Sequence, residues 1–179
     1  MCKFIQIIYN PRLTLFQNLH YIPHIKNCYE RYSKYLHDDF ASNSFNLYIE
    51  ETSPYIWAIL DYNDQFMGFV SLDNFIGDNT HKYSAEILTC FERKAWGKFT
   101  RYSAKFFLKK CFDELGLYKI KALVYPDNFR ISSLLKHAGF KYETTLPAET
   151  VRFGKLQDIK QFAIYRTYYY NEVKDGNKR

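Results

Sequence analysis

A chain of 179 residues with 47% hydrophobic and 25% charged residues has a globular composition, which excludes a disordered chain. The net charge of +6 favours anionic partners, but Lys and Arg form no long block, so a phosphate-bearing ligand explains the charge at least as well as nucleic acid does. No apolar run reaches the ~18 residues needed to cross a bilayer, and the N-terminus has no signal-peptide pattern. We therefore expect a cytoplasmic protein that does not contact membranes.

The cysteines and histidines argue against disulfides and metal sites. His20 and His24 are four residues apart, but Pro23 between them argues against a helical metal pair. The cysteines show neither pairing nor metal spacing, which is typical of a reducing compartment; they are Cys2, Cys28, Cys90 and Cys111. We expect no metal.

The N-terminal part of the chain predicts one strand followed by helices. The β-branched and aromatic run Lys3–Tyr9 predicts a strand. Apolar residues recur at helical spacing over Leu13–Leu36, where Pro23 should separate two helices. The polar stretch Asp38–Ser44 predicts a loop, and Phe45–Glu50 fits a short strand or a helix end.

Three strands should follow. They are expected over Tyr55–Tyr62, Gln65–Phe75 and Lys82–Phe91, with polar turns between them. Short turns between consecutive strands favour antiparallel pairing, so these segments predict a meander.

The second half alternates helices and strands. Helical spacing predicts a helix over Phe99–Leu115, with Gly116 at its C-terminal cap, and a second helix over Phe129–His137. Between them, Tyr118–Tyr125 reads as a strand. The last strands are expected over the following ranges: Tyr142–Phe153 and Lys160–Tyr169.

This order of elements predicts a mixed sheet with helices on its faces, in the α/β or α+β class. The chain shows no repeat, linker or low-complexity segment, so we expect a single domain over residues 1–173 and a flexible tail at 174–179.

The stretch EILTCFERKAWGKFTRYSA, residues 86–104, changes character halfway. It begins as a buried strand, passes through a basic turn with one glycine and ends as the first turn of a helix. Lys94, Gly97 and Lys98 thus lie where the strand gives way to the helix. A helix N-terminus preceded by a glycine turn is a natural anion site, because free N–H groups and the helix dipole both point at it. The alternative is a turn glycine beside a solvated basic face.

Three segments resemble the GNAT superfamily of N-acetyltransferases, in the family's order and spacing. They are Glu86–Ala104, Tyr125–Phe140 and Gly139–Tyr165. The first is similar to the corresponding stretch of the ribosomal-protein and amino-sugar N-acetyltransferase branch. The resemblance implies a GNAT fold, with a mixed, mostly antiparallel sheet of six to seven strands, about four helices and a sheet splayed at the cofactor cleft.

The resemblance also implies an activity. GNAT enzymes move an acetyl group directly from acetyl-CoA to a primary amine, here on a protein N-terminus, a lysine, an amino sugar or a polyamine. GNAT proteins often pair, which is compatible with a homodimer. The acceptor site should come from the least family-like region, residues 13–46. Nearby carboxylates could attract a cationic amine; they are Glu30, Asp38, Asp39, Glu50 and Glu51.

The resemblance assigns roles to particular residues. The backbone of Thr89, Cys90 and Phe91 would pair with pantetheine, and Glu86 would take the proton from the amine. Asn128 would touch the cofactor side of the second helix, and it can cap that helix whether or not a cofactor binds. The pyrophosphate would lie on the turn and the first helical residues, which are Lys94, Trp96, Gly97, Lys98, Phe99, Thr100 and Arg101. The structural alternatives are a salt-bridged Glu86 and a Trp96 that only packs.

Several positions depart from the family pattern, and two of them bear on cofactor binding and catalysis. Phe99 replaces the second glycine of the turn, so it either crowds the pyrophosphate or points into the core. Leu135 stands where many members have a tyrosine that protonates the leaving thiolate. These departures keep a second hypothesis open, in which the protein is a catalytically degenerate structural or binding module, for example a viral or assembly component.

Overall fold

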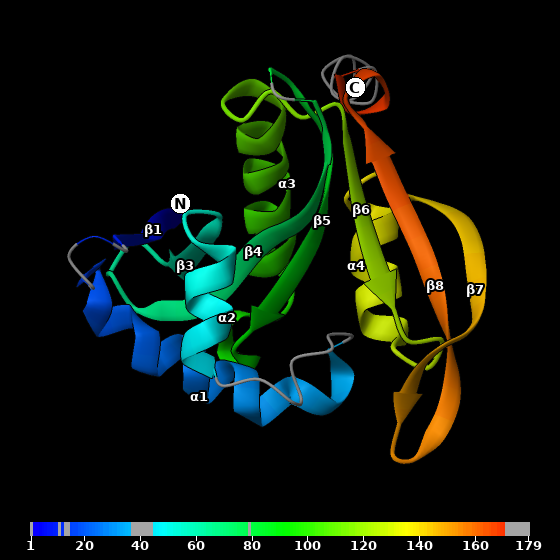
Figure 1. Ribbon diagram of the computed structural model, residues 1–179, viewed down its shortest axis with the longest axis horizontal. Helices are drawn as coiled ribbons and strands as arrows, with labels where there is room; N and C mark the ends of the chain where they lie inside the picture. The colour runs from blue at the N-terminus through cyan, green and yellow to red at the C-terminus, as the bar shows by residue number, and fades with distance from the viewer. Residues whose placement is uncertain (1, 11, 13–14, 37–44, 79, 171–179) are drawn as a thin grey trace. The chain divides into compact units, whose positions relative to one another are not determined.

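The computed structural model describes residues 2–10, 12, 15–36, 45–78 and 80–170 (Figure 1). Its α-helices are α1 (Ile22–Tyr32), α2 (Phe45–Thr52), α3 (Lys98–Asp113) and α4 (Phe129–His137). Its strands are β1 (Lys3–Asn10), β2 (Leu15–Gln17), β3 (Ile56–Leu60), β4 (Phe66–Gly77), β5 (Lys82–Phe91), β6 (Lys119–Val124), β7 (Lys141–Arg152) and β8 (Lys155–Tyr165). The chain divides into two compact units, one of Met1–Asp73 with Leu88–Thr100 and one of Asn74–Ile87 with Arg101–Arg179.

The first unit is built on the strand order β2-β1-β3-β4, with the C-terminal part of β5 after β4. β1 pairs with β3 and β3 with β4, both antiparallel. All five residues of β3 are buried, because the strand has neighbours on both sides and side chains against both faces. The core of this unit joins sheet residues to the two N-terminal helices; it includes Ile7, Ile25, Cys28, Tyr48, Ile49, Ile56, Phe69 and Cys90.

The prediction of two helices over Leu13–Leu36 is wrong in its first part. Leu15–Gln17 forms a strand that pairs antiparallel with β1, and Asn18 then takes a left-handed conformation with φ of 61°. Pro23 lies in the first turn of α1 rather than between two helices. Proline fits there because the first N–H groups of a helix have no partner within the helix. Leu13 and the expected loop at Asp38–Ser44 lie outside the described residues.

The predicted meander is close to the observed strands. β5 has the predicted bounds, and β4 extends two residues beyond the predicted Gln65–Phe75. The ambiguous Phe45–Glu50 belongs to helix α2.

The second unit has the strand order β5-β6-β8-β7, with the N-terminal part of β5 at its start. β6 is parallel to β5, whereas β8 is antiparallel to both β6 and β7. Figure 1 shows α4 behind β6. α4 has the predicted bounds, and Gly116 has φ of +69° just after α3, as its predicted cap role requires.

The last strand begins five residues earlier than predicted. Phe153 and Gly154 have φ of 53° and 73°, which makes the turn between β7 and β8 only two residues long. β8 therefore starts at Lys155 and ends at Tyr165, and residues 166–170 are helical.

The predicted class, a mixed and mostly antiparallel sheet with four α-helices, is confirmed in the described residues; the short β2 raises the number of strands to eight. That residues 1–173 fold as a single domain stays a prediction. The expected tail at 174–179 lies outside the described residues.

Candidate active site

The turn between β5 and α3 has an open glycine at its tip. β5 ends at Phe91, a short 3-10 helix covers Arg93–Ala95, and α3 begins at Lys98. Gly97 has φ of +106°, and a Cβ added to it would meet no atom within 4 Å. The left-handed conformation explains the glycine, and the open space around it would let a ligand approach the backbone.

Side-chain hydrogen bonds fix the conformation of this turn. The Thr100 hydroxyl donates to the carbonyl of Ala95 at 2.7 Å, and both residues are buried. The Trp96 indole Nε1–H donates to the carbonyl of Phe91 at 3.2 Å, while 43% of the Trp96 residue surface stays exposed. The turn is therefore held on both sides of Gly97 by the protein itself.

The charges around Gly97 suit an anion. Lys94 and Lys98 are exposed, and within the described part of the chain neither pairs with a carboxylate. The positive end of the α3 dipole adds to their charge. Phe99 is half-buried, and Arg101, which is exposed, belongs to the second unit. Open backbone, unpaired lysines and a helix N-terminus together fit a pyrophosphate group.

The end of β5 lies tightly against β4. Cys90 and Phe91 are buried and Thr89 is half-buried. Gly68 of β4 approaches so closely that a Cβ on it would lie 2.3 Å from the carbonyl oxygen of Cys90. The amide of Glu92 donates to the carbonyl of Met67 at 2.9 Å and continues the contact past Phe91.

Glu86, the predicted proton acceptor, is ion-paired within the second unit. Its carboxylate accepts from Lys121 Nζ at 2.7 Å and from Asn74 Nδ2 at 3.0 Å, and 19% of its side chain is exposed. Glu86 and Lys121 are register partners in the parallel pairing of β5 with β6. These two contacts fix the direction of the carboxylate.

Asn128 is the N-cap of α4, the structural alternative that the sequence left open for it. Its side-chain oxygen accepts from the amide of Ile131 at 3.3 Å. Leu135, where the family often has a tyrosine, is buried in the same helix.

Sequence reasoning missed the contacts that one face of α1 makes with this region. Cys28 Sγ lies 3.5 Å from Cys90 Sγ, and Arg31 Nη1 lies 2.6 Å from Glu92 Oε2. The helical spacing in α1 was readable, but partners about sixty residues away were not. The hydrogen bond with the Cys28 thiol, followed by burial, raises the pKa of Cys90, which favours the protonated form of the Cys90 thiol.

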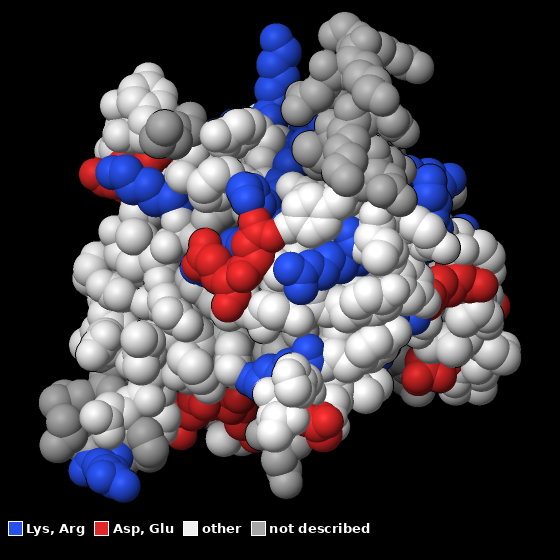
Figure 2. Space-filling view, turned by 90° about the horizontal axis from the view of Figure 1, so that it is seen from above, with Lys and Arg blue, Asp and Glu red and all other residues white. Residues whose placement is uncertain are grey.

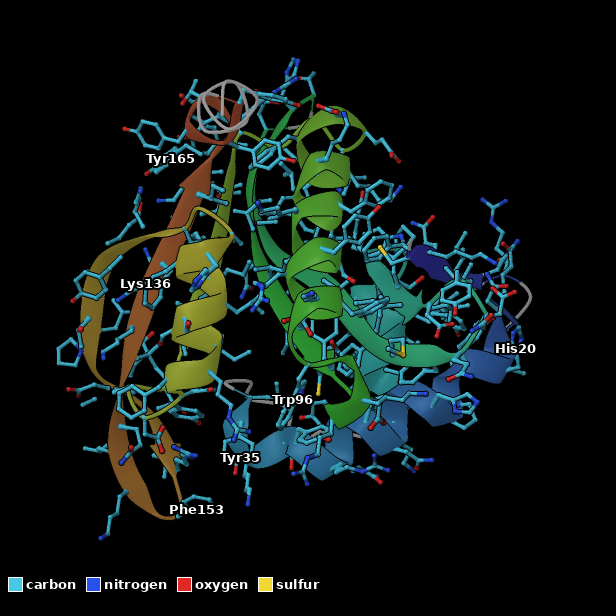
Figure 3. All side chains as sticks on the ribbon, turned by 180° about the vertical axis from the view of Figure 1, so that it is seen from behind. His20, Tyr35, Trp96, Lys136, Phe153 and Tyr165 are labelled. Carbon is cyan, nitrogen blue, oxygen red and sulfur yellow. The ribbon has the colours of Figure 1, made fainter. Side chains whose placement is uncertain are left out.

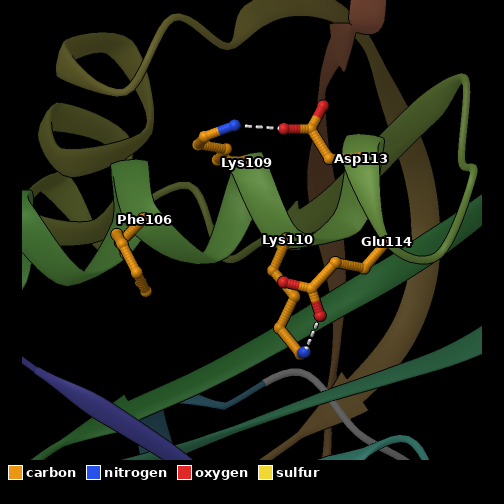
Figure 4. A pocket seen from close by; sticks show the side chains of 5 residues that line it. All are labelled: Phe106, Lys109, Lys110, Asp113 and Glu114. Carbon is orange, nitrogen blue, oxygen red and sulfur yellow. Dashed lines mark hydrogen bonds and ion pairs between the residues drawn. The ribbon is translucent and has the colours of Figure 1, made fainter.

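Other features of the described residues carry no site of their own. A pocket at the C-terminal end of α3 is lined by Phe106 and by two ion pairs, Lys109 with Asp113 and Lys110 with Glu114 (Figure 4). On the face in Figure 2 acidic and basic side chains are interspersed, unlike a nucleic-acid-binding surface. In the described ranges no three His, Cys, Asp or Glu residues could hold a metal, and no helix is long and apolar enough to cross a membrane.

Comparison with known proteins identifies the family. The family model described as acetyltransferase (GNAT) domain matches residues 8–141. The chain belongs to the GNAT acetyltransferase family. The GNAT resemblance read from the sequence is thereby confirmed, and the protein is an N-acetyltransferase that uses acetyl-CoA. A search of curated proteins found no significant match.

Solved GNAT structures share the fold. A spermidine N-acetyltransferase from Vibrio cholerae, in complex with CoA and spermine, is 22% identical, with a TM-score of 0.75 over 95% of this chain and 98% of that one. A single-residue variant of the same enzyme, SpeG, is 21% identical, with a TM-score of 0.75 over 96% and 98% of the two chains. These similarities extend the GNAT fold to nearly the whole of the present chain.

Proposed function

We propose that this N-acetyltransferase acetylates a primary amine of a polyamine, with the acetyl-CoA pyrophosphate held by the turn at Gly97. The observation that carries the proposal is the turn itself, with its open left-handed glycine, the N-terminus of α3 and two lysines that pair with no carboxylate among the residues the structure describes. The residues of the proposed cofactor site are the backbone of Thr89, Cys90 and Phe91, then Lys94, Trp96, Gly97, Lys98, Phe99, Thr100 and Arg101, with Asn128 on α4.

Two observations support a polyamine as the acceptor. The solved structures with the same fold include a spermidine N-acetyltransferase in complex with spermine. Carboxylates that suit a polycation lie in the N-terminal helices, where Glu30 and Glu51 are exposed and Glu50 is half-buried. Glu30 is engaged only loosely, at 3.8 Å from Lys26 Nζ. Asp38 and Asp39 lie outside the described residues.

The chemistry assigns separate tasks to the strand and to Glu86. Acetyl-CoA supplies a thioester whose carbonyl carbon the neutral amine attacks. Backbone N–H groups of the Thr89–Phe91 segment would polarise that carbonyl. Glu86 would receive the proton that the amine loses, and Lys121 and Asn74 hold its carboxylate in one orientation. The C–S bond of the thioester then breaks and CoA leaves as its thiolate. Leu135 has no acidic proton to give, so the thiolate takes its proton from solvent.

The first test is a thermal shift with acetyl-CoA, with desulfo-CoA and ATP as controls. At ~100 times its dissociation constant, a ligand specific for the folded state adds roughly 2.7 kcal/mol of stability. We expect a clear shift for the natural protein and none for Gly97→Glu, whose carboxylate would repel the pyrophosphate. Gly116→Glu is the matched control, because Gly116 also has positive φ and open space. No shift with millimolar acetyl-CoA would contradict the proposed site.

The second test addresses the acceptor and the base. The rate of acetyl transfer to spermidine and spermine should exceed the rate of transfer to glucosamine or to a peptide. The reverse order would show that a polyamine is not the acceptor, while the acetyltransferase activity itself would stand. Glu86→Gln should lower kcat roughly 10²- to 10⁴-fold and leave acetyl-CoA binding unchanged. An unchanged kcat would show that Glu86 is not the base and that its role is the ion pair with Lys121.

A further inference from the structure

One face of α1 lies against the end of β5 and the turn that follows it. Cys28, Arg31 and Tyr32 are three and four residues apart, so they share a side of the helix. Cys28 contacts Cys90 at 3.5 Å, and the Tyr32 ring lies 6.1 Å from that of Trp96. Figure 3 shows Trp96 near the C-terminal end of α1. All these residues belong to the first unit.

Arg31 makes the charged contact of this face. Its Nη1 donates to Glu92 Oε2 at 2.6 Å. Glu92 is 16% exposed at its side chain, whereas Arg31 is 57% exposed. The Glu92 carboxylate raises the pKa of Arg31, with a hydrogen bond involving Tyr32 as the next contribution. The pair thus places a solvent-facing cation over a largely buried anion.

Glu92 creates an electrostatic problem for the proposed cofactor site. It lies two residues before Lys94, at the start of the turn that would receive the doubly charged pyrophosphate. A carboxylate shielded from water keeps more of its field than an exposed one, and that field repels phosphate. The negative charge of Glu92 would then offset part of the positive potential that Lys94 and Lys98 present to the ligand.

We propose that Arg31 is a positioning residue for acetyl-CoA, which neutralises Glu92 and so keeps the turn at Gly97 attractive to phosphate. This inference rests on the proposed function, because it assumes that the turn holds the pyrophosphate. A packing role for α1 would affect the binding of every acetyl donor. The neutralisation of Glu92 by Arg31 should instead affect only the binding of the charged pyrophosphate and leave the binding of the uncharged acyl-pantetheine arm unchanged.

The test uses two acetyl donors with and without phosphate. Arg31→Met should weaken acetyl-CoA binding and lower kcat/KM for acetyl-CoA roughly two- to fivefold in low salt, the size expected of one partly screened charge pair. The kcat/KM for S-acetylpantetheine, which has no pyrophosphate, should stay unchanged. High salt should reduce the loss for acetyl-CoA. Lys26→Met is the matched control, because it removes a cation of the same helix whose ion pair is with Glu30.

A second-site variant separates charge from packing. Adding Glu92→Gln to Arg31→Met should restore acetyl-CoA binding, because the unneutralised carboxylate is then gone. Arg31→Lys should keep most of the affinity, and it remains informative if Arg31→Met does not fold. Equal losses for both donors, or a double variant that is not rescued, would overturn the inference. Acetyl-CoA binding to the natural protein is measured before that of any variant. If the natural protein does not bind acetyl-CoA, both the proposed cofactor site and this inference are wrong; if it does, the variants test the inference alone.

Discussion

Replacement of Gly68 by alanine tests how closely β4 must approach the end of β5. A Cβ there would lie 2.3 Å from the Cys90 carbonyl oxygen and 2.8 Å from the Phe91 Cα, whereas ordinary contacts begin at 3.4 Å. Both neighbours are backbone atoms, which cannot rotate away as a side chain can. The two strands would therefore have to separate by about 1 Å.

The expected cost follows from this separation. Overpacking of a well-packed interior costs about 1–3 kcal/mol, and in a chain of this size each kcal/mol lowers Tm by roughly 2–4 °C. Gly116→Ala is the matched control: it has φ of +69° but open space around its Cβ, so only the backbone preference of roughly 1 kcal/mol applies. Gly68→Ala should therefore lower Tm clearly more than Gly116→Ala does.

Calorimetry of the two variants measures these shifts, and titration with acetyl-CoA shows whether the strand displacement reaches the proposed site. We expect weaker acetyl-CoA binding for Gly68→Ala alone, because Cys90 and Phe91 supply backbone groups there. If Gly68→Ala melts no lower than Gly116→Ala, the close approach of the strands is not a constraint, and the reasoning is refuted.

Two more predictions concern hydrogen-bonded clusters away from the turn. Burial by itself would raise the pKa of Glu143, but hydrogen bonds from Lys119, Gln161 and Tyr165 outweigh it and lower that pKa. Glu143→Gln should therefore reduce Tm at pH 7 by roughly 2–4 °C, and the difference from the natural protein should shrink as pH falls through the lowered pKa of the folded state, where the carboxylate protonates; a constant difference across acid pH would contradict the pKa direction. The buried Tyr48 hydroxyl lies 2.7 Å from Ser71 Oγ, so Tyr48→Phe should lower the free energy of unfolding in urea by about 1–3 kcal/mol. The double variant Tyr48→Phe with Ser71→Ala should lose less than the sum of the two single losses, and strict additivity would show that the two hydroxyls are not coupled.

Local sequence signals predicted the elements best where local chemistry decides them. The bounds of β5 and α4 were readable because alternation, an N-cap asparagine and a glycine stop mark them. Leu15–Gln17 was misread as helix because its strand conformation depends on pairing with β1, which is a non-local contact. The same limit hid the pairing of Arg31 with Glu92: each residue alone is an ordinary surface charge, and only the folded chain brings them together.

The candidate site shows a similar division. The basic glycine turn could be found from residue types alone, and the positive φ and open space at Gly97 belong to it; that the turn binds an anion stays a prediction. The capping role of Asn128 could also be anticipated. The environment of Glu86 could not, because its partner Lys121 comes from a strand that pairs in parallel after an intervening helix.

The burial of every cysteine makes the thiols internal reporters of opening. Cys2, Cys28 and Cys90 lie in the first unit and Cys111 in the second, and none of the four forms a disulfide. A thiol reagent can modify them only when the surrounding structure opens, so the rate of labelling at each position measures the opening of that neighbourhood in native conditions. Mass spectrometry of the labelled peptides would time the two units separately. Saturating acetyl-CoA should slow the labelling of Cys90 more than that of Cys111, which links ligand binding to local protection without any engineered probe.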